Sequence, residues 1–128
     1  MARSATIRMP IRWRDIDSLG HVNQSVYHEL LEEGRGALFE SLIEEHGSFD
    51  FVLARVELDY KREVRHSDGA VDVITSIERI GRSSVTLAAE IRLFDGTIAA
   101  EGRSVLVAWD SEGRRSRPLT EWEREQLA

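Results

Sequence analysis

Four stretches in the second half of the chain alternate apolar and polar residues, which is typical of β-strands that bury one face. Asp-Gly pairs at 68–69 and 95–96 mark turns between them. The last stretch ends in the apolar run Val105–Trp109, which predicts burial on both faces or against a partner chain. The predicted strands cover residues 52–61, 71–77, 85–93 and 98–109.

The first half of the chain predicts one more strand and one long helix. Alternation through Ile7, Met9, Ile11 and Trp13 predicts a half-buried strand. If that strand continued, Asp15 and Asp17 would share its apolar parity. The helix, expected to end near Gly47, follows from apolar or small residues at 3.6-residue spacing, namely Tyr27, Leu31, Gly34, Leu38 and Leu42. Gly34 lies within this apolar stripe, which indicates close approach of the helix to a sheet.

These elements predict an α+β fold in which an antiparallel sheet of about five strands wraps around one long helix. Pro118 and Thr120 predict a short C-terminal helix with Thr120 as its N-cap. The 128 residues fit a single domain, 1–128. One helix covers only part of such a sheet, and the exposed edges favour a homodimer or homotetramer.

Composition excludes several classes of protein. A formal charge of -6 argues against a nucleic-acid binder, and no apolar run reaches the roughly 20 residues of a membrane span. The chain has no Cys and no signal-peptide pattern, so we expect a soluble, cytoplasmic protein. His28, His46 and His66 show no metal-ligand spacing with one another, and we expect no metal and no cofactor.

The segment most indicative of chemistry runs from Asp15 to Asn23 and places two carboxylates just before the helix. A buried carboxylate is unfavourable unless it has hydrogen-bonding partners or a raised pKa. The first N–H groups of a helix have no intrahelical acceptor and carry partial positive charge, so they suit a developing oxyanion. Gly20 permits a tight turn and close approach of a ligand. This combination indicates a hydrolase.

Trp13-Arg14-Asp15-Ile16-Asp17-Ser18-Leu19-Gly20-His21-Val22-Asn23, with Tyr27, Glu32, Glu33 and Arg35, resembles the hot-dog-fold acyl-CoA thioesterases of the 4-hydroxybenzoyl-CoA thioesterase-like family. The resemblance spans nearly the whole chain. It implies the hot-dog fold, a homodimer or dimer of dimers, active sites at subunit interfaces and a catalytic carboxylate at Asp17. Two positions depart from the family pattern: Gln24 replaces a frequent asparagine, and Arg62 a frequent proline.

We therefore expect an acyl-CoA thioesterase in which Asp17 is the nucleophile or general base, coenzyme A entering only as part of the substrate. Backbone N–H groups around Val22, Asn23 and Gln24 are the expected oxyanion donors. His21 is a catalytic candidate that orients the carboxylate or shuttles a proton, although a loop or subunit contact explains it equally well. Asp15 is expected to be structural. Asn23 fits a helix N-cap, with Ser25 as a competitor for that role.

The substrate-binding candidates are Gly20, Val22, Asn23, Tyr27, Tyr60 and Arg82. Tyr27 and Tyr60 either line an acyl pocket or fill the core. Three clusters of basic residues are candidates for binding the phosphates of coenzyme A, and Arg82 is the preferred single residue among them. The other members are Lys61, Arg62, Arg65, Arg79, Arg114, Arg115 and Arg117. Two alternatives stay open: a hydroxyacyl-thioester dehydratase with His21 as base, and a non-catalytic acyl-CoA binding protein. Aromatic, short-chain and medium-chain acyl groups all remain open.

Overall fold

A computed structural model describes residues 3–42 and 49–128. Its secondary structure follows the hydrophobic pattern closely, and the long helix ends at Leu42 in the described residues; the expected end near Gly47 lies outside them. The elements are β1 (Ser4–Pro10), η1 (Trp13–Asp15), α1 (Gln24–Leu42), β2 (Phe51–Tyr60), η2 (His66–Asp68), β3 (Ala70–Ile80), β4 (Ser84–Arg92), β5 (Ile98–Asp110), β6 (Arg115–Ser116) and α2 (Glu121–Leu127).

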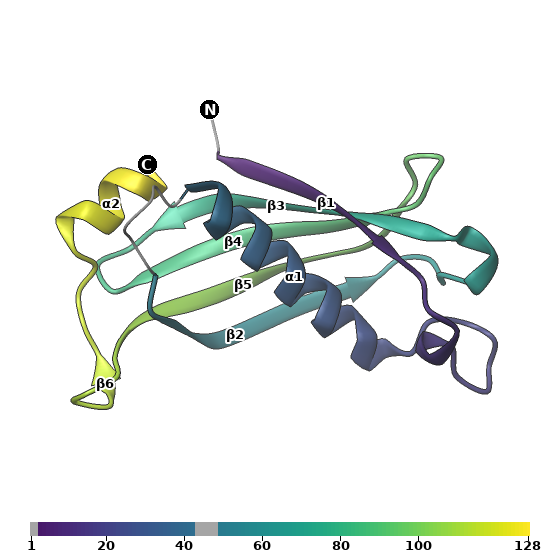
Figure 1. The fold of residues 1–128 in the computed structure, drawn as a ribbon, viewed down its shortest axis with the longest axis horizontal. Coiled ribbons are helices and arrows are strands. Elements are labelled where there is room, and N and C mark those ends of the chain that lie inside the picture. The colour runs from purple at the N-terminus through teal and green to yellow at the C-terminus, as the bar shows by residue number, and fades with distance from the viewer. Residues whose placement is uncertain (1–2, 43–48) are drawn as a thin grey trace.

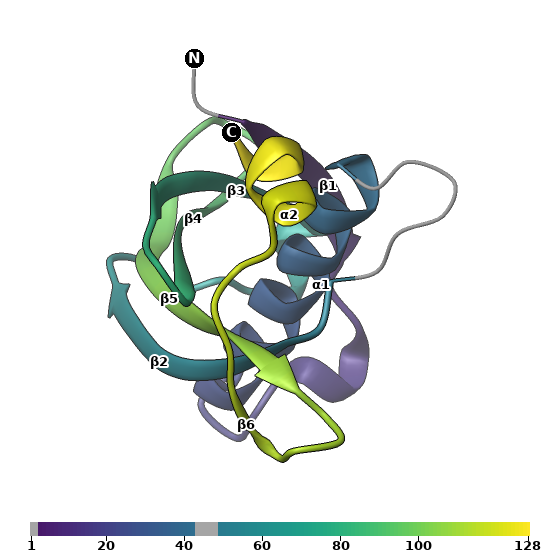
Figure 2. The same cartoon turned by 90° about the vertical axis from the view of Figure 1, so that its left-hand side faces the viewer.

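The long strands form one antiparallel sheet in the order β1-β3-β4-β5-β2, and the short β6 pairs with β5. The sheet lies along α1 and curls around it, as the end-on view shows (Figures 1 and 2). This arrangement confirms the predicted α+β fold with a sheet wrapped around one helix. Within the described part of the chain, β1 and β2 are the edge strands, because each pairs with a single neighbour.

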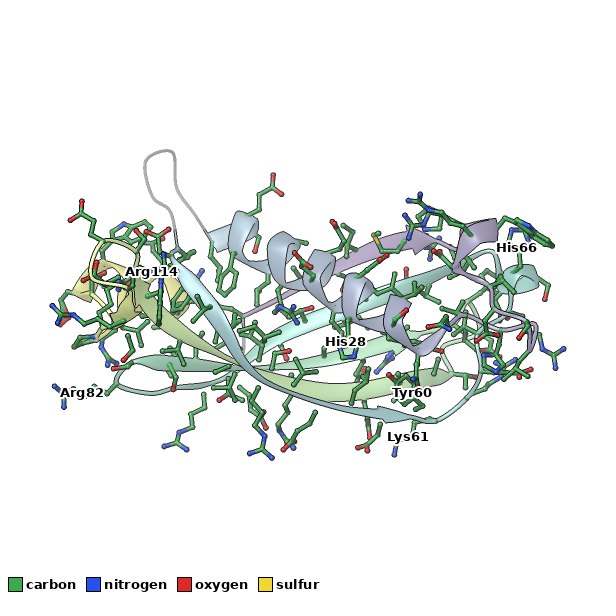
Figure 3. The ribbon with its side chains drawn as sticks, turned by 90° about the horizontal axis from the view of Figure 1, so that it is seen from below. His28, Tyr60, Lys61, His66, Arg82 and Arg114 are labelled. Atoms are coloured by element: carbon green, nitrogen blue, oxygen red, sulfur yellow. The ribbon has the colours of Figure 1, made fainter. Side chains whose placement is uncertain are left out.

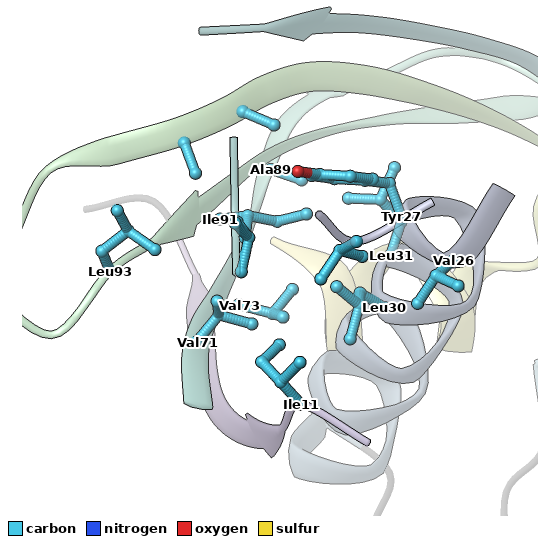
Figure 4. Close-up of a cluster of buried hydrophobic side chains, with 14 residues drawn as sticks. Ile11, Val26, Tyr27, Leu30, Leu31, Val71, Val73, Ala89, Ile91 and Leu93 are labelled. Atoms are coloured by element: carbon cyan, nitrogen blue, oxygen red, sulfur yellow. The ribbon is translucent and has the colours of Figure 1, made fainter. Parts of the chain in front are cut away.

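The core fills the space between α1 and the concave face of the sheet (Figure 4). Leu30 and Leu31 of α1 meet Val73 and Ile91 of the sheet, all of them nearly inaccessible to solvent. Full burial of such side chains contributes about 1.5–3 kcal/mol each to folding. A second cluster around Leu38 continues the core toward α2.

Gly34 lies where the helix approaches the sheet most tightly. A Cβ added there would lie 2.6 Å from Thr75 Oγ1 and 2.6 Å from Val73 Cγ1, far inside van der Waals contact. Close approach at Gly34, predicted from the sequence, is therefore confirmed. The hydroxyl of Thr75 is buried at this contact and has no hydrogen-bond partner among the described residues.

The predicted strand near the N-terminus ends earlier than a continued alternation would place it. β1 stops at Pro10, and the next residues turn into the 3-10 helix η1. Ile11 is buried as expected, but Trp13 is 77% exposed, so its assignment to the buried parity is wrong. The reason is local: once the backbone leaves the extended conformation, side chains no longer alternate between two faces.

The C-terminal end is predicted correctly in its cap but not in its last strand. Thr120 is the N-cap of α2, and its hydroxyl accepts from the Glu123 N–H while the Glu123 carboxylate accepts from the Thr120 N–H. The polar turn after Asp110 contains the two-residue strand β6, which the sequence did not reveal. Leu106 and Ala108 of the apolar run face the core, whereas Val105 and Val107 are only half-buried, so burial on both faces is wrong for the single chain.

None of the helices in residues 3–42 and 49–128 combines the length and apolar character that crossing a bilayer requires.

Candidate active site

The loop that joins η1 to α1 is a tight turn pinned at both ends. Ile16 and Val22 form an antiparallel bridge, and the Asp17 N–H donates to the His21 carbonyl over 3.0 Å. Between them the Gly20 N–H donates to the Asp17 carbonyl over 3.1 Å, and Gly20 has a φ of +82°. Residues other than glycine rarely adopt this left-handed conformation. The tight turn predicted at Gly20 is therefore present.

This turn holds the Asp17 carboxylate in place but leaves it partly open. Its Oδ1 accepts from the Leu19 N–H over 2.9 Å, and its Oδ2 accepts from Asn23 Nδ2 over 3.3 Å. His21 Nδ1 lies 3.9 Å from the same Oδ2. The Asp17 side chain is 22% exposed. An anchored carboxylate with remaining acceptor capacity and access to a ligand is the arrangement that a nucleophile or general base needs.

Asn23 links this carboxylate to the start of α1. Its Oδ1 accepts from the Ser25 N–H over 2.9 Å, which makes Asn23 the N-cap of the helix and confirms the capping interpretation. The Ser25 hydroxyl also donates to Asn23 Oδ1 and supports the cap instead of competing for it. One amide side chain therefore fixes both Asp17 and the first turn of the helix.

The same turn shows which backbone donors remain available to a ligand. The Val22 N–H donates to the Val64 carbonyl over 2.7 Å, and the Asn23 N–H donates to the Asp15 carbonyl over 2.9 Å. The expectation of free donors at all the residues from Val22 to Gln24 is therefore too broad. Only the Gln24 N–H, of these, has no acceptor within the described part of the chain. It is the first residue of α1, where an unpaired N–H and the helix dipole favour an anion.

Asp15 behaves as the structural residue that the sequence suggested. It is 3% exposed and accepts from both the backbone N–H and the guanidinium of Arg12. Burial alone would raise the pKa of Asp15, but these hydrogen bonds outweigh it and hold the pKa below its ordinary value. Arg12 also pairs with Glu29 of α1, so this network ties η1 to the helix.

Two tyrosines form one wall of a cavity beside the helix start. The rings of Tyr27 and Tyr60 pack edge to face with centroids 4.9 Å apart, and the Tyr60 hydroxyl donates to the Gln24 carbonyl over 3.3 Å. Tyr27 is 3% exposed, and its burial raises the pKa of its phenol. Tyr27 thus packs in the core and lines the cavity at once. The cavity measures about 300 Å³ and is lined by His21, Val22, Gln24, Tyr27, Tyr60, Lys61, Arg62 and Glu63.

A second cavity lies beside the same helix start. It measures about 540 Å³, and Asp17 and Asn23 line it together with Arg12, Arg14, Asp15, Ile16, Ser25, Val26 and Glu29. The two cavities share no lining residue: Asp17 lines the second, whereas His21 and Gln24 line the first. The side chains of Asp17 and His21 nevertheless approach each other.

The basic residues divide between the two ends of the molecule. Lys61 and Arg62 follow β2 and line the cavity at the helix start, as Tyr60 does. Arg82 lies at the opposite end, in the β3–β4 turn, where α2 packs and Arg124 donates to the Arg82 carbonyl (Figure 3). A single chain therefore does not bring Arg82 to Asp17, and its role in binding coenzyme A stays a prediction. In the sequence, the position of Lys61 and Arg62 directly after Tyr60 is what indicates that they line the same cavity as Tyr60.

The described ranges, 3–42 and 49–128, contain no cluster of three or more His, Asp or Glu side chains that could hold a metal ion.

The chain is similar in sequence and structure to thioesterases. A family model described as "Thioesterase-like superfamily" matches residues 11–127. A structure described as a predicted thioesterase from Bacillus stearothermophilus shares 33% identity with a TM-score of 0.87, covering 97% of this chain and 93% of that one. A thioesterase from Thermus thermophilus, complexed with coenzyme A and Zn, shares 32% identity with a TM-score of 0.78, covering 95% and 90%.

A more distant structure shows how far the fold extends. A mutant of 4-hydroxybenzoyl CoA thioesterase, complexed with 4-hydroxybenzoyl CoA, has a TM-score of 0.87 at 18% identity, covering 99% of this chain and 100% of that one. At this identity the likeness concerns the fold, which is the hot-dog fold expected from the sequence. A search of curated proteins finds no match to this chain.

Proposed function

Since the chain belongs to the thioesterase-like superfamily and is a thioester hydrolase, we propose that it hydrolyses acyl-CoA thioesters to the free acid and coenzyme A. The observation that carries this proposal is the anchored, partly open Asp17 carboxylate at a helix start whose Gln24 N–H is free among the described residues. The Thermus thermophilus relative, 32% identical and complexed with coenzyme A, supports coenzyme A as the leaving group.

The chemistry follows from these groups. A thioester needs a nucleophile or a general base at its carbonyl carbon and a donor for the oxygen that becomes anionic, whereas the thiolate leaves readily. Asp17 attacks the carbonyl to give a mixed anhydride, which water then hydrolyses, or it takes a proton from an attacking water. The Gln24 N–H donates to the oxyanion, which requires the thioester carbonyl to lie where the two cavities adjoin, close to the point at which His21 Nδ1 and Asp17 Oδ2 are 3.9 Å apart. This mechanism uses only groups of the chain, the substrate and water.

The other residues of the site position these groups. Asn23 orients Asp17 through its amide, and His21 Nδ1 lies 3.9 Å from Asp17 Oδ2. Lys61 and Arg62 line the cavity that Tyr27 and Tyr60 bound, and we expect them to bind the phosphates of coenzyme A there. For Arg82 to reach the same ligand, it would have to come from a second copy of the chain.

We also propose that the protein is a homodimer or homotetramer with β2 at its interface. β2 is an edge strand of the described sheet, and it exposes Val52 (37%) and Leu53 (46%). An edge of this kind pairs readily with another strand. In a symmetric antiparallel pair, the end of β2 near Phe51 would face the end near Tyr60 of the other copy. This would bring the cavity that Tyr27 and Tyr60 line to the interface.

The test is a panel of aromatic, short-chain and medium-chain acyl-CoA thioesters assayed with a free-thiol reagent. We expect thiol release with at least one acyl class, and near-complete loss of it in Asp17→Asn. Glu125→Gln, at an exposed carboxylate of α2, is the matched control and should keep the wild-type rate. Binding of acyl-CoA without turnover across the panel would overturn the proposal. Loss of thioester absorbance without free thiol would indicate a dehydratase instead.

The nucleophilic and general-base routes for Asp17 are distinguished by quenching the reaction during a single turnover and measuring the mass of the protein by mass spectrometry. The nucleophilic route leaves an acyl adduct on the fragment that contains Asp17. The general-base route leaves the protein mass unchanged at every time point.

A further inference from the structure

The Asn23 amide at the start of α1 can face in only one direction. Its Oδ1 accepts from the Ser25 N–H over 2.9 Å and from the Ser25 hydroxyl over 2.7 Å. A backbone N–H can only donate, so the amide turns its oxygen toward Ser25 and its NH2 group away from it. The NH2 group then faces Asp17, with Nδ2 3.3 Å from Oδ2, and donates to the carboxylate. Ser25 therefore determines which end of the amide Asp17 meets.

This amide sets the direction of the Asp17 carboxylate. Among the described side chains, Asn23 is the one that donates a hydrogen bond to Asp17. The other anchor is the Leu19 N–H, two residues away in the same turn, which donates to Oδ1. His21 Nδ1, at 3.9 Å from Oδ2, lies beyond hydrogen-bond distance. One donor on each oxygen fixes the plane of the carboxylate, whereas loss of the donor on Oδ2 would let the group rotate about its last bond.

The Ser25 hydroxyl supports this arrangement from the other end of the amide. Together with the Ser25 N–H it engages both lone pairs of Asn23 Oδ1, and both donors belong to the second residue of α1. Hydrogen bonds in a chain polarise one another, so a donor on Oδ1 strengthens the bond that Nδ2 donates. Among the described residues, no hydrogen bond joins Ser25 to Asp17 directly, so the hydroxyl acts on Asp17 through Asn23.

We propose that Ser25 is a positioning residue for thioester hydrolysis, whose hydroxyl holds the Asp17 carboxylate in its reactive direction through the Asn23 amide. The inference rests on the proposed function, in which Asp17 is the group that reacts. Reacting atoms must lie about 3–3.5 Å apart, and a misplacement of about 1 Å costs about 10²-fold in rate. A helix residue that locks the amide against the carboxylate supplies this accuracy without itself reacting.

Steady-state thiol release and thermal melting test the role of the hydroxyl. Ser25→Ala removes the hydroxyl and keeps the backbone N–H, so it should melt at the wild-type temperature. It should lower kcat about tenfold and leave KM unchanged. Ser25→Thr, which restores a hydroxyl at the same position, should recover most of the loss. Ser41→Ala is the matched control and should keep the wild-type kcat, because the Ser41 hydroxyl donates to the Leu38 carbonyl of the same helix.

A second variant separates the helix cap from the orientation of Asp17. Serine caps a helix about as well as asparagine, but it has no NH2 group for the carboxylate. Asn23→Ser should therefore keep the wild-type stability and lower kcat about 10²-fold. Adding Ser25→Ala to Asn23→Ser should cause no further loss, because the hydroxyl then has no amide through which to act. Losses in kcat that multiply in the double variant would overturn the proposal.

A measurement without turnover reads the same chain of contacts. Nitrogen–proton correlation NMR spectra resolve side-chain NH2 groups, and the Asn23 signal is the one that disappears in Asn23→Ser. Ser25→Ala and Asp17→Asn should each shift this signal, because they change the partners at the two ends of the amide. Ser41→Ala should leave it in place. An Asn23 signal that Ser25→Ala does not move would overturn the proposal.

The outcomes separate this inference from the proposed function. Wild-type protein that releases no thiol from any acyl-CoA, or Asp17→Asn protein that releases it at the wild-type rate, would contradict the proposed function. Thiol release that depends on Asp17, together with an unchanged kcat in Ser25→Ala, would overturn the positioning role alone. So would a Ser25→Ala protein that melts earlier but keeps its kcat per folded molecule, or one in which KM alone rises.

Discussion

Two carboxylates lie on either side of Ile16 in opposite environments. Asp15, in the 3-10 helix η1, is 3% exposed and its oxygens are engaged by Arg12. Asp17, in the following loop, is 22% exposed and is held by a backbone N–H and a neutral amide. A carboxylate neutralised by an arginine stabilises the fold but has little basicity left, whereas one held by neutral donors remains available for chemistry.

Helix α2, near the C-terminus, contains a carboxylate in an environment like that of Asp15. Glu123 of α2 is 2% exposed and receives both ends of the Arg117 guanidinium, at 2.7 and 2.9 Å, as well as the Thr120 N–H. It resembles Asp15 in being saturated and structural. The comparison predicts that changes at Asp17 and Gln24 affect rate, whereas changes at Asp15 and Glu123 affect stability.

After the catalytic carboxylate itself, the largest effect is expected from removing the free N–H of Gln24 at the helix start. Gln24→Pro deletes the free N–H at the first helical position, where proline is well tolerated. Loss of one oxyanion donor reduces kcat about 10²–10³-fold, or about 2.7–4 kcal/mol. Steady-state thiol release measures it. Gln24→Ala keeps the N–H and is the matched control; equal rates in the two variants would show that the side chain or another donor performs this role.

Glu123→Gln should give the next largest effect, on stability alone. It leaves the Arg117 guanidinium without its anion, and breaking a buried pair of this kind lowers the free energy of unfolding by about 3 kcal/mol. Urea unfolding followed by circular dichroism measures the loss. Per folded molecule, thiol release should match the wild type. A variant as stable as the wild type but slower would contradict the assignment of Glu123 to the structural group.

The same pair predicts a pH dependence. Burial raises the pKa of Glu123, but the hydrogen bonds and charge of Arg117 and the Thr120 N–H outweigh it, so its pKa in the folded protein lies below the ordinary value. A lowered pKa contributes stability that is present above the unfolded value, about 4.3, and is lost as the pH falls through the folded value. The free energy of unfolding should therefore drop below about pH 4.3, and the drop should be shallower in Glu123→Gln.

A smaller effect is expected at the contact between helix and sheet. Gly34→Ala forces a methyl group against Thr75 and Val73 and should destabilise the fold by about 1–3 kcal/mol. Gly36→Ala, two residues along the same helix, meets no atom within 4 Å and should stabilise it by about 0.5–1 kcal/mol. Thermal melting of both variants measures the difference, and a shift of the same sign in the two would contradict the close approach at Gly34.

The sequence predicted the features that depend on local pattern. The strands from Phe51 to Asp110, the helix after Asn23 and the Thr120 cap all follow from periodicity or from side chains that bond their own backbone. It failed where the chain departs from a regular period, as at Trp13, because the 3-10 turn has no strong signature of its own.

The sequence suggested the residues of the candidate site but not their contacts. Asp17 and His21 come from one segment, so their proximity follows from the sequence. The acceptors that occupy the Val22 and Asn23 N–H groups come from Val64 and from Asp15, and no local pattern reveals such pairings.

The most direct test measures thiol release and thermal melting side by side in Asp17→Asn and Asp15→Asn. Asp17→Asn should melt at the wild-type temperature and release thiol about 10²–10⁴-fold more slowly. Asp15→Asn should lose about 2 kcal/mol of unfolding free energy, because Arg12 loses a charged partner, yet keep its rate per folded molecule. Wild-type rates of thiol release in a folded Asp17→Asn protein would contradict the account.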